Sequence, residues 1–307
     1  MTAYIVRRLF MLIPIWFGIL LLTFLMRVLV PGDPIQLMFA GQYSDPVVEA
    51  QMRHKFGLDK PLPTQFVDYV EGVAHGDLGF SITAQQPVTK LIEAHYPYTV
   101  VLTLTSLSIA VTIGLVTGIV SALRKDTIVD LISMIFALAG LSMPAFWLGL
   151  LLIYVFAVDL GWFPVLGSMS PKGLVLPSVT LGFIASAVTA RLVRSTMIDV
   201  LNEDYIRTAR AKGLVETRVV LRHALRNALI PIVTIIGLQF GGLLSGAFIV
   251  EVIFAWHGIG ELAITALQHR DFPLIQGIVL VVATTYVLVN LAVDIVYAVL
   301  DRRIIYS

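Results

Sequence analysis

The sequence contains no cysteine, which excludes disulfides and thiolate metal sites. Charged residues are also scarce, at 13% of 307 residues, roughly half the usual fraction. Hydrophobic residues make up 58%, more apolar surface than a soluble fold could bury. The net charge is only +1, so the composition does not indicate a nucleic-acid partner. Together these features predict an integral membrane protein in contact with lipid.

Several enzyme signatures are also missing. There is no H-E-x-x-H or G-x-S-x-G pattern, which removes the usual metalloprotease and serine hydrolase motifs. A P-loop needs Gly-Lys followed by Ser or Thr, yet none of the six lysines precedes either residue. We therefore expect no catalytic, metal or cofactor site in this chain. If ATP is used, another chain must bind and hydrolyse it.

Six apolar stretches approach or exceed the roughly 20 residues that a helix needs to cross a bilayer. Lipid satisfies no backbone hydrogen bonds, so each stretch is predicted to be a helix. The first is too long for a signal-peptide core and is expected to be retained. The sequence thus predicts an all-α, polytopic protein with a single transmembrane domain over 1–307 and helices at about 9–30, 97–123, 131–157, 174–194, 228–250 and 274–299.

Lys and Arg are distributed unevenly between the connecting segments. With the N-terminus inside, 14 of the 21 lie in inner segments, which is the bias expected for cytoplasmic loops. This predicts that both termini are cytoplasmic, that 31–96 is an extracytoplasmic segment between the first two helices, and that 195–227 is a cytoplasmic loop.

The inner loop carries a complete signal for a short helix. Asn202 is a candidate N-cap, and Gly213 can end the helix. Tyr205, Ile206 and Ala209 fall on one face and predict an exposed apolar strip for a soluble partner. The alternative is an interfacial helix lying on the membrane lipid. The candidate site comprises Glu203, Asp204, Tyr205, Ile206, Arg207, Thr208, Ala209, Arg210, Ala211, Lys212 and Gly213.

A few polar residues lie within or near the predicted spans. Gln239 and Glu251 are the candidates for facing a translocation pathway, and Arg27 and Asp294 lie close to helix ends. Pro144 and Pro231 are expected to kink their helices. Small residues four apart predict close helix packing, within one bundle or against a second subunit, at Gly114 and Gly118, Gly237 and Gly241, and Gly242 and Gly246.

The stretch EDYIRTARAKGLVETRVVLRHALRNALIPIVTIIG at 203–237 resembles the coupling loop of permeases from binding-protein-dependent ABC importers. More specifically, it resembles the group that carries dipeptides, oligopeptides, nickel or glutathione. Similar segments run along nearly the whole chain: PGDP at 31–34, GLDKPL at 57–62, GDLGFS at 76–81, LSMPAFWLG at 141–149, RDFPLIQG at 270–277 and NLAVDIVY at 290–297. The chain departs from that group at His257 and Arg302, where proline is usual.

The resemblance implies a type I importer permease of a prokaryotic cell membrane. Its expected partners are a second, homologous permease, two cytoplasmic ATPase subunits that bind ATP and Mg²⁺, and an extracytoplasmic solute-binding protein. The 203–213 helix would then couple ATP hydrolysis to import of di- or oligopeptides. A nickel chelate and glutathione are the alternative cargoes. An ion-coupled secondary transporter and a non-transporting membrane scaffold are the alternative functions.

Overall fold

The computed structural model describes residues 2–29, 46–55 and 57–300. The PGDP segment at 31–34 and Arg302 lie outside this range. The described residues are helical apart from turns, connecting segments and one isolated bridge between Phe80 and Pro87. The predicted all-α class is therefore confirmed.

Four helices are long and apolar enough to cross a membrane without interruption. They are α1 (Thr2–Leu29), α5 (Val88–Leu123), α8 (Pro171–Leu201) and α13 (Phe272–Leu300). Two further candidate spans are bent pairs of helices, which brings the count over the described residues to six if each pair crosses once. The chain is thus a polytopic membrane protein, as predicted.

The first bent pair replaces the single helix expected over 131–157. It consists of α6 (Ile128–Ser142), followed by α7 (Ala145–Leu152) and the π-helical η1 (Ile153–Asp159), with a bend of 104°. The break falls at Pro144, and Met143 before it is extended. A residue that precedes proline is sterically pushed out of the helical region, which explains why α6 ends there.

The second bent pair begins within the loop predicted over 195–227. It begins with α10 (Glu216–Arg218) and the π-helical η2 (Val219–Ala224) and continues as α11 (Leu225–Ile253). The part before residue 230 and the part after it are bent by 56° relative to each other. Pro231 lies inside α11 and lacks the N–H that would complete the helical ladder. The expected kink at this proline is therefore present.

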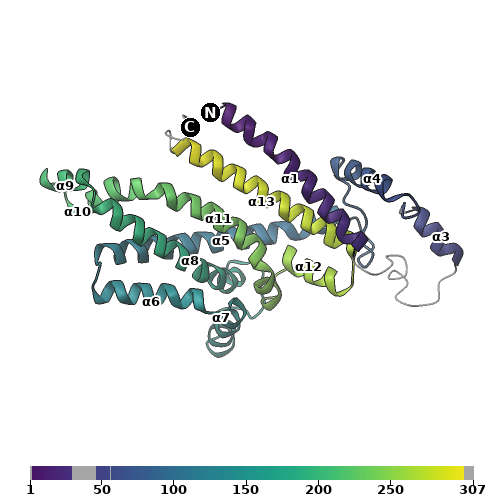
Figure 1. Ribbon diagram of the computed structural model, residues 1–307. Helices are drawn as coiled ribbons and strands as arrows, with labels where there is room; N and C mark the ends of the chain where they lie inside the picture. Colours follow the sequence, from purple (N-terminus) through teal and green to yellow (C-terminus); the bar gives the residue numbers. More distant parts are fainter. Residues whose placement is uncertain (1, 30–45, 56, 301–307) are drawn as a thin grey trace.

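The helices run roughly along one axis, with accessory helices at both ends (Figure 1). The short α9 (Asp204–Ala211) and α10 lie at one end of the bundle, whereas α3 (Pro46–Lys55) and α4 (Leu62–Ala74) lie at the other. Helices α1 and α13 lie side by side along one edge, and α12 (Ile259–Gln268) packs between α11 and α13.

Glycines allow the main helices to approach closely. A Cβ added at Gly118 would lie 2.6 Å from the Val193 Cβ of α8, and one at Gly114 would lie 2.5 Å from the Thr189 Cβ. Gly237 and Gly241 leave similar room for the α13 side chains. These two glycine pairs therefore allow close packing within one bundle, which is one of the two alternatives predicted from the sequence; the other was packing against a second subunit.

Candidate functional site

Helix α9 is the candidate coupling helix, and its boundaries agree closely with the predicted 203–213 segment. Glu203 is its N-cap residue and Lys212 its C-cap residue. Gly213 follows with φ of +75°, and its N–H donates to the Arg210 carbonyl at 2.9 Å. A left-handed residue after the last turn is the usual way to end a helix, and glycine adopts it without strain.

The prediction that Asn202 caps this helix is wrong. Helix α8 continues to Leu201, so Asn202 lies at the end of α8. Its side-chain amide donates to the Ile198 carbonyl at 3.0 Å and satisfies one of the unpaired carbonyls there. The long α8 therefore leads directly into α9 through only two residues.

The apolar strip expected to be exposed on α9 is largely covered by the chain itself. Ile206 is 0% exposed and Ala209 only 7%. Both belong to a buried apolar cluster, defined here as the inner core, that joins α5, α8, α9, η2 and α11; its other members are Ala122, Val193, Met197, Val219, Val220, Ala224, Ala228 and Ile232. Helix α9 is therefore anchored to the spans by the face that the sequence assigned to a partner.

Polar contacts tie the rest of α9 to α10 and α11. Asn227 donates to the Tyr205 hydroxyl at 2.7 Å, which ties α9 to the start of α11. Arg210 donates to both Glu216 carboxylate oxygens, at 3.2 and 2.6 Å. This hydrogen-bonded carboxylate raises the pKa of Arg210 above its ordinary value. Because both side chains are solvent-exposed, the pair orients α9 more than it stabilises the fold.

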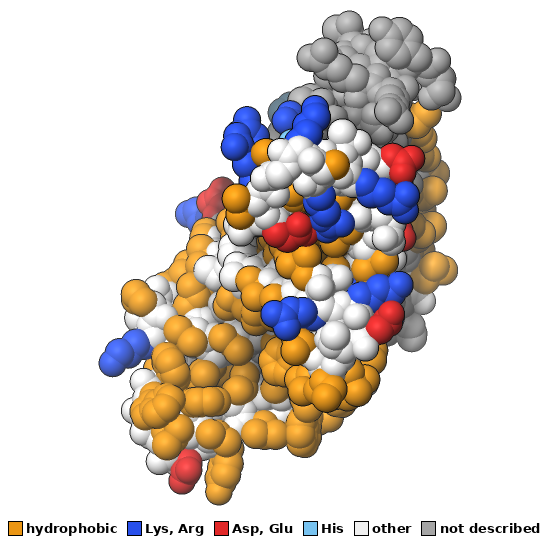
Figure 2. Space-filling view, turned by 90° about the vertical axis from the view of Figure 1, so that its left-hand side faces the viewer, with side chains coloured by type: hydrophobic (Ala, Val, Ile, Leu, Met, Phe, Trp, Pro, Cys, Tyr) orange, Lys and Arg blue, Asp and Glu red, His pale blue; other side chains and the backbone are white. Residues whose placement is uncertain are grey.

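The opposite face of α9 is open and basic. Arg207 pairs only loosely with Asp204, at 3.4 Å, and both are exposed. Thr208, Ala211 and Lys212 are also exposed. Figure 2 looks onto this end of the molecule, where Lys and Arg side chains gather above a largely hydrophobic flank. The site thus combines a buried anchoring face with a charged outer face.

Gln239 lies in α11, and its side-chain amide forms hydrogen bonds with residues of α8. The Thr189 hydroxyl donates to its carbonyl oxygen at 3.1 Å, and its amide nitrogen donates to the Ala185 carbonyl at 3.1 Å. The side chain is half-buried between these two helices. Its expected place on a translocation pathway remains a prediction.

Glu251 lies near the end of α11 and is 0% exposed. Its carboxylate accepts from the Thr99 hydroxyl at 2.7 Å and from the backbone N–H groups of Gly260 at 2.6 Å and Glu261 at 3.1 Å. The two N–H groups belong to the first turn of α12, where helices have unpaired donors. Glu251 therefore joins α5, α11 and α12, and a pathway role for it also remains a prediction.

The sequence analysis did not predict one pair of charged residues that the structure brings together. Arg194 of α8 and Asp130 of α6 form a bidentate ion pair, and the Ser121 hydroxyl and the Asp126 N–H also donate hydrogen bonds to Asp130. The available signal was the presence of opposite charges at the inner ends of two predicted spans.

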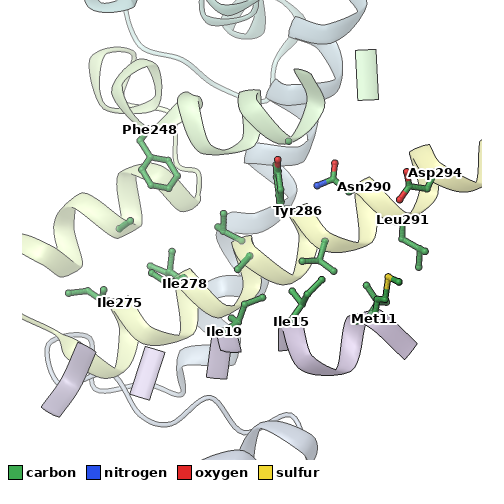
Figure 3. A pocket seen from close by; sticks show the side chains of 17 residues that line it. Met11, Ile15, Ile19, Phe248, Ile275, Ile278, Tyr286, Asn290, Leu291 and Asp294 are labelled. Carbon is green, nitrogen blue, oxygen red and sulfur yellow. The ribbon is translucent and has the colours of Figure 1, made fainter. Parts of the chain in front are cut away.

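A large apolar cavity lies between α1, α11 and α13 (Figure 3). Its volume is about 700 Å³, and its walls include Ile15, Phe248, Ile278 and Tyr286. Asn290 and Asp294 line its far end. Neither Gln239 nor Glu251 lines this cavity.

Solved structures share this arrangement of helices. A crystal structure titled as an amino acid ABC transporter with histidines matches with a TM-score of 0.52 and 21% identity, covering 70% of this chain and 94% of that chain. An inward-facing MetNI methionine ABC transporter matches with a TM-score of 0.59 and 20% identity, covering 69% and 96%. The fold is that of a membrane-spanning subunit of an ABC transporter.

Sequence comparisons place the chain in a family. The model described as "Binding-protein-dependent transport system inner membrane component" matches residues 114–306, and a model of the N-terminal part of such membrane components matches residues 1–103. The chain therefore belongs to the inner-membrane permease family of binding-protein-dependent ABC transporters. In this family, nucleotide binding and ATP hydrolysis lie on partner subunits.

Curated relatives match over the full length. The di/tripeptide transport system permease protein DppB of Pseudomonas aeruginosa (strain UCBPP-PA14) is 45% identical over 99% of both chains. The glutathione transport system permease protein GsiC of Escherichia coli (strain K12) is 45% identical over 100% of both chains. Family membership confirms the predicted importer permease and decides against the ion-coupled secondary transporter and the membrane scaffold.

Proposed function

We propose that this chain forms half of the pathway through which an ATP-driven importer carries di- or tripeptides, including glutathione. The observation that carries this proposal is the 45% identity, over essentially whole chains, to permeases named for those cargoes. A nickel chelate is the less favoured cargo because neither of these relatives is named for it. The complex would contain a second homologous permease, two ATPase subunits and an extracytoplasmic binding protein.

Helix α9 would couple the ATPases to the pathway. Its inner face is packed into the inner core with α5, α8 and α11, so a displacement of α9 would move these spans. Its outer face is exposed and basic and would lie in a groove of an ATPase subunit. Closure of the ATPases on ATP would then favour one of two arrangements of the bundle.

This proposal requires α9 and both termini to be cytoplasmic and α4 to lie outside. The chain has no cysteine, so single cysteines can be introduced without a background. Thr208→Cys and Glu71→Cys place thiols at exposed positions at opposite ends of the bundle. In intact cells a membrane-impermeant maleimide should label only Glu71→Cys. Labelling of Thr208→Cys under the same conditions would contradict this topology.

The decisive experiment purifies the complex through a tag on this chain and measures ATPase activity and peptide uptake in proteoliposomes. We expect ATPase subunits and a second permease to co-purify, and the binding protein to stimulate hydrolysis. Uptake that persists without ATP but is abolished by collapse of the proton gradient would contradict the proposal.

Two variants test the role of α9 directly. Arg207→Glu and Thr208→Trp alter its exposed face without touching the inner core. Both should insert normally, retain less ATPase subunit and lose stimulated hydrolysis. Lys125→Glu is the matched control, because Lys125 is also exposed and lies in the turn between α5 and α6. Parent-like ATPase recovery and hydrolysis in both α9 variants would show that another surface carries the contact.

A further inference from the structure

A small pocket lies at the outer end of α1, at the end of the bundle opposite α9. It is bounded by α4, by the segment after α4 and by the start of α13. Three segments singled out in the sequence meet there: GLDKPL, GDLGFS and RDFPLIQG. Its volume is about 240 Å³, below the roughly 300 Å³ at which pockets begin to hold drug-sized ligands. The group that fills it must therefore be small.

Gln276 supplies an unused hydrogen-bond donor in this pocket. Its side chain lies in the first turns of α13 and is only 8% exposed. Among the described residues its amide nitrogen makes no well-formed hydrogen bond, although buried polar groups in folded proteins are nearly always paired, and its side chain also interacts with Tyr69 on the wall of the same pocket. An acceptor from a ligand would satisfy this group.

Arg27 supplies a cation at the same pocket. Its guanidinium donates to the Gln65 side-chain oxygen at 2.5 Å and lies 5.2 Å from the centre of the Phe24 ring. Within residues 2–29, 46–55 and 57–300, no carboxylate oxygen lies within 4.0 Å of it. A guanidinium has five N–H donors in a planar fork that suits a carboxylate, and within the described part of the chain the side-chain bond to Gln65 uses only one of them.

Asp77 supplies an anion on the wall of the same pocket. One of its oxygens accepts from the Gly79 N–H at 2.8 Å, and among the described residues no cation lies within 4.0 Å of it. The other acid in the wall, Asp68, is already paired with Lys60 at 2.6 Å. Arg27 and Asp77 therefore line one pocket with opposite charges and do not pair with each other.

From these observations we propose that the pocket binds a small zwitterion, such as a free amino acid or a dipeptide. The carboxylate of the solute bonds to the Arg27 guanidinium and the Gln276 amide, and its ammonium group lies against Asp77. A solute that carries both charges matches the two unpaired groups together, whereas a simple anion would use only one side. The inference rests on the pocket alone and does not depend on which cargo the transporter carries.

The test titrates diglycine into the purified transporter complex in lipid nanodiscs, without binding protein or nucleotide, by isothermal calorimetry. We expect saturable binding that Arg27→Gln and Gln276→Leu each weaken at least tenfold. Arg270→Gln is the matched control, because Arg270 is an exposed arginine that does not line the pocket. It should leave the affinity unchanged. Gln276→Leu removes an unpaired buried donor and is expected to fold, so the test does not depend on the Arg27 variant.

A second ligand, acetate, distinguishes the contribution of Arg27 to binding from that of Asp77. Acetate offers only a carboxylate, so Asp77→Asn should weaken diglycine binding but leave acetate binding unchanged. Diglycine should also raise the melting temperature of the parent complex and not that of Gln276→Leu.

Three outcomes would overturn the proposal. The first is that the parent shows no saturable binding of diglycine. The second is that Arg27→Gln and Gln276→Leu both bind diglycine as tightly as the parent does. The third is that Asp77→Asn weakens the binding of acetate as much as the binding of diglycine. If the parent binds no diglycine and Arg27→Gln instead lowers affinity for the binding protein, the pocket takes an acidic side chain of that protein. Normal stimulated hydrolysis alongside any of these results would leave the proposed transport function standing.

Discussion

Arg194 donates two hydrogen bonds to Asp130, with nitrogen–oxygen distances of 2.7 and 2.6 Å. The pair joins α8, which leads into the candidate coupling helix α9, to α6, which ends just before Pro144. Asp130 is nearly buried, whereas Arg194 keeps 27% of its side-chain surface exposed. The pair therefore fixes two helices that must move together if α9 transmits force.

Removal of the arginine alone should be more harmful than removal of both charges. Arg194→Gln leaves the Asp130 carboxylate buried without its cation, and we expect a loss of about 1–3 kcal/mol in the free energy of unfolding. In the double variant Asp130→Asn/Arg194→Gln the unpaired charge is gone, so part of this loss should return. Thermal unfolding in detergent of both single variants and the double variant measures the coupling. Strictly additive effects would show that the two side chains act independently.

The close approach of α5 and α8 should make Gly118 intolerant of any side chain. A Cβ there would lie 2.6 Å from the Val193 Cβ and 2.7 Å from the Ala190 carbonyl oxygen, and the backbone oxygen cannot move aside easily. We expect Gly118→Ala to destabilise the protein by about 1–3 kcal/mol, the usual cost of overpacking. Gly242→Ala is the matched control, because nothing lies within 4 Å of its added Cβ. A melting temperature for Gly118→Ala equal to that of the control would contradict this packing.

Much of the candidate site could be read from the sequence, because its signals are local. The acidic first turn and Gly213 define α9 within one or two residues, although the predicted N-cap, Asn202, ends α8 instead. The burial of Ile206 and Ala209 could not be read, because an apolar strip does not show whether its partner is another chain or η2 of the same chain. The Arg194–Asp130 pair joins residues 64 positions apart, so no local pattern contains it. The 104° break at Pro144 exceeds an ordinary proline kink, and periodicity alone does not set its size.

Asp271 should make the contact between the start of α13 and the segment after α4 sensitive to acid. Burial of its carboxyl raises the pKa, but hydrogen bonds from Ser81, Thr83 and the Leu274 N–H outweigh this effect and hold the pKa below its ordinary value. Because the folded pKa is lowered, the stabilisation is complete above the unfolded value, about 3.9, and is lost as the pH falls through the folded value.

The measurement follows the melting temperature of the parent and of Asp271→Asn from pH 7 down to pH 3. The variant should be less stable at pH 7, and the difference should shrink in acid as the parent carboxylate is protonated. Asp159→Asn is the control, because Asp159 is exposed. A constant difference between the parent and Asp271→Asn over this range would show that ionisation of Asp271 does not contribute.

Gly213 offers a test of α9 that removes none of the side chains of the helix. Its φ of +75° is unfavourable for a residue with a Cβ and most unfavourable for a β-branched one, whereas asparagine tolerates it. No other atom would lie within 4 Å of an added Cβ, so a substitution acts through the backbone alone. Gly213→Val should therefore distort the end of α9 and lower binding-protein-stimulated ATPase activity and uptake, whereas Gly213→Asn should keep most of both. If the two variants are equally active in proteoliposomes, the shape of this turn does not matter for coupling, and the role of α9 must rest on its exposed side chains.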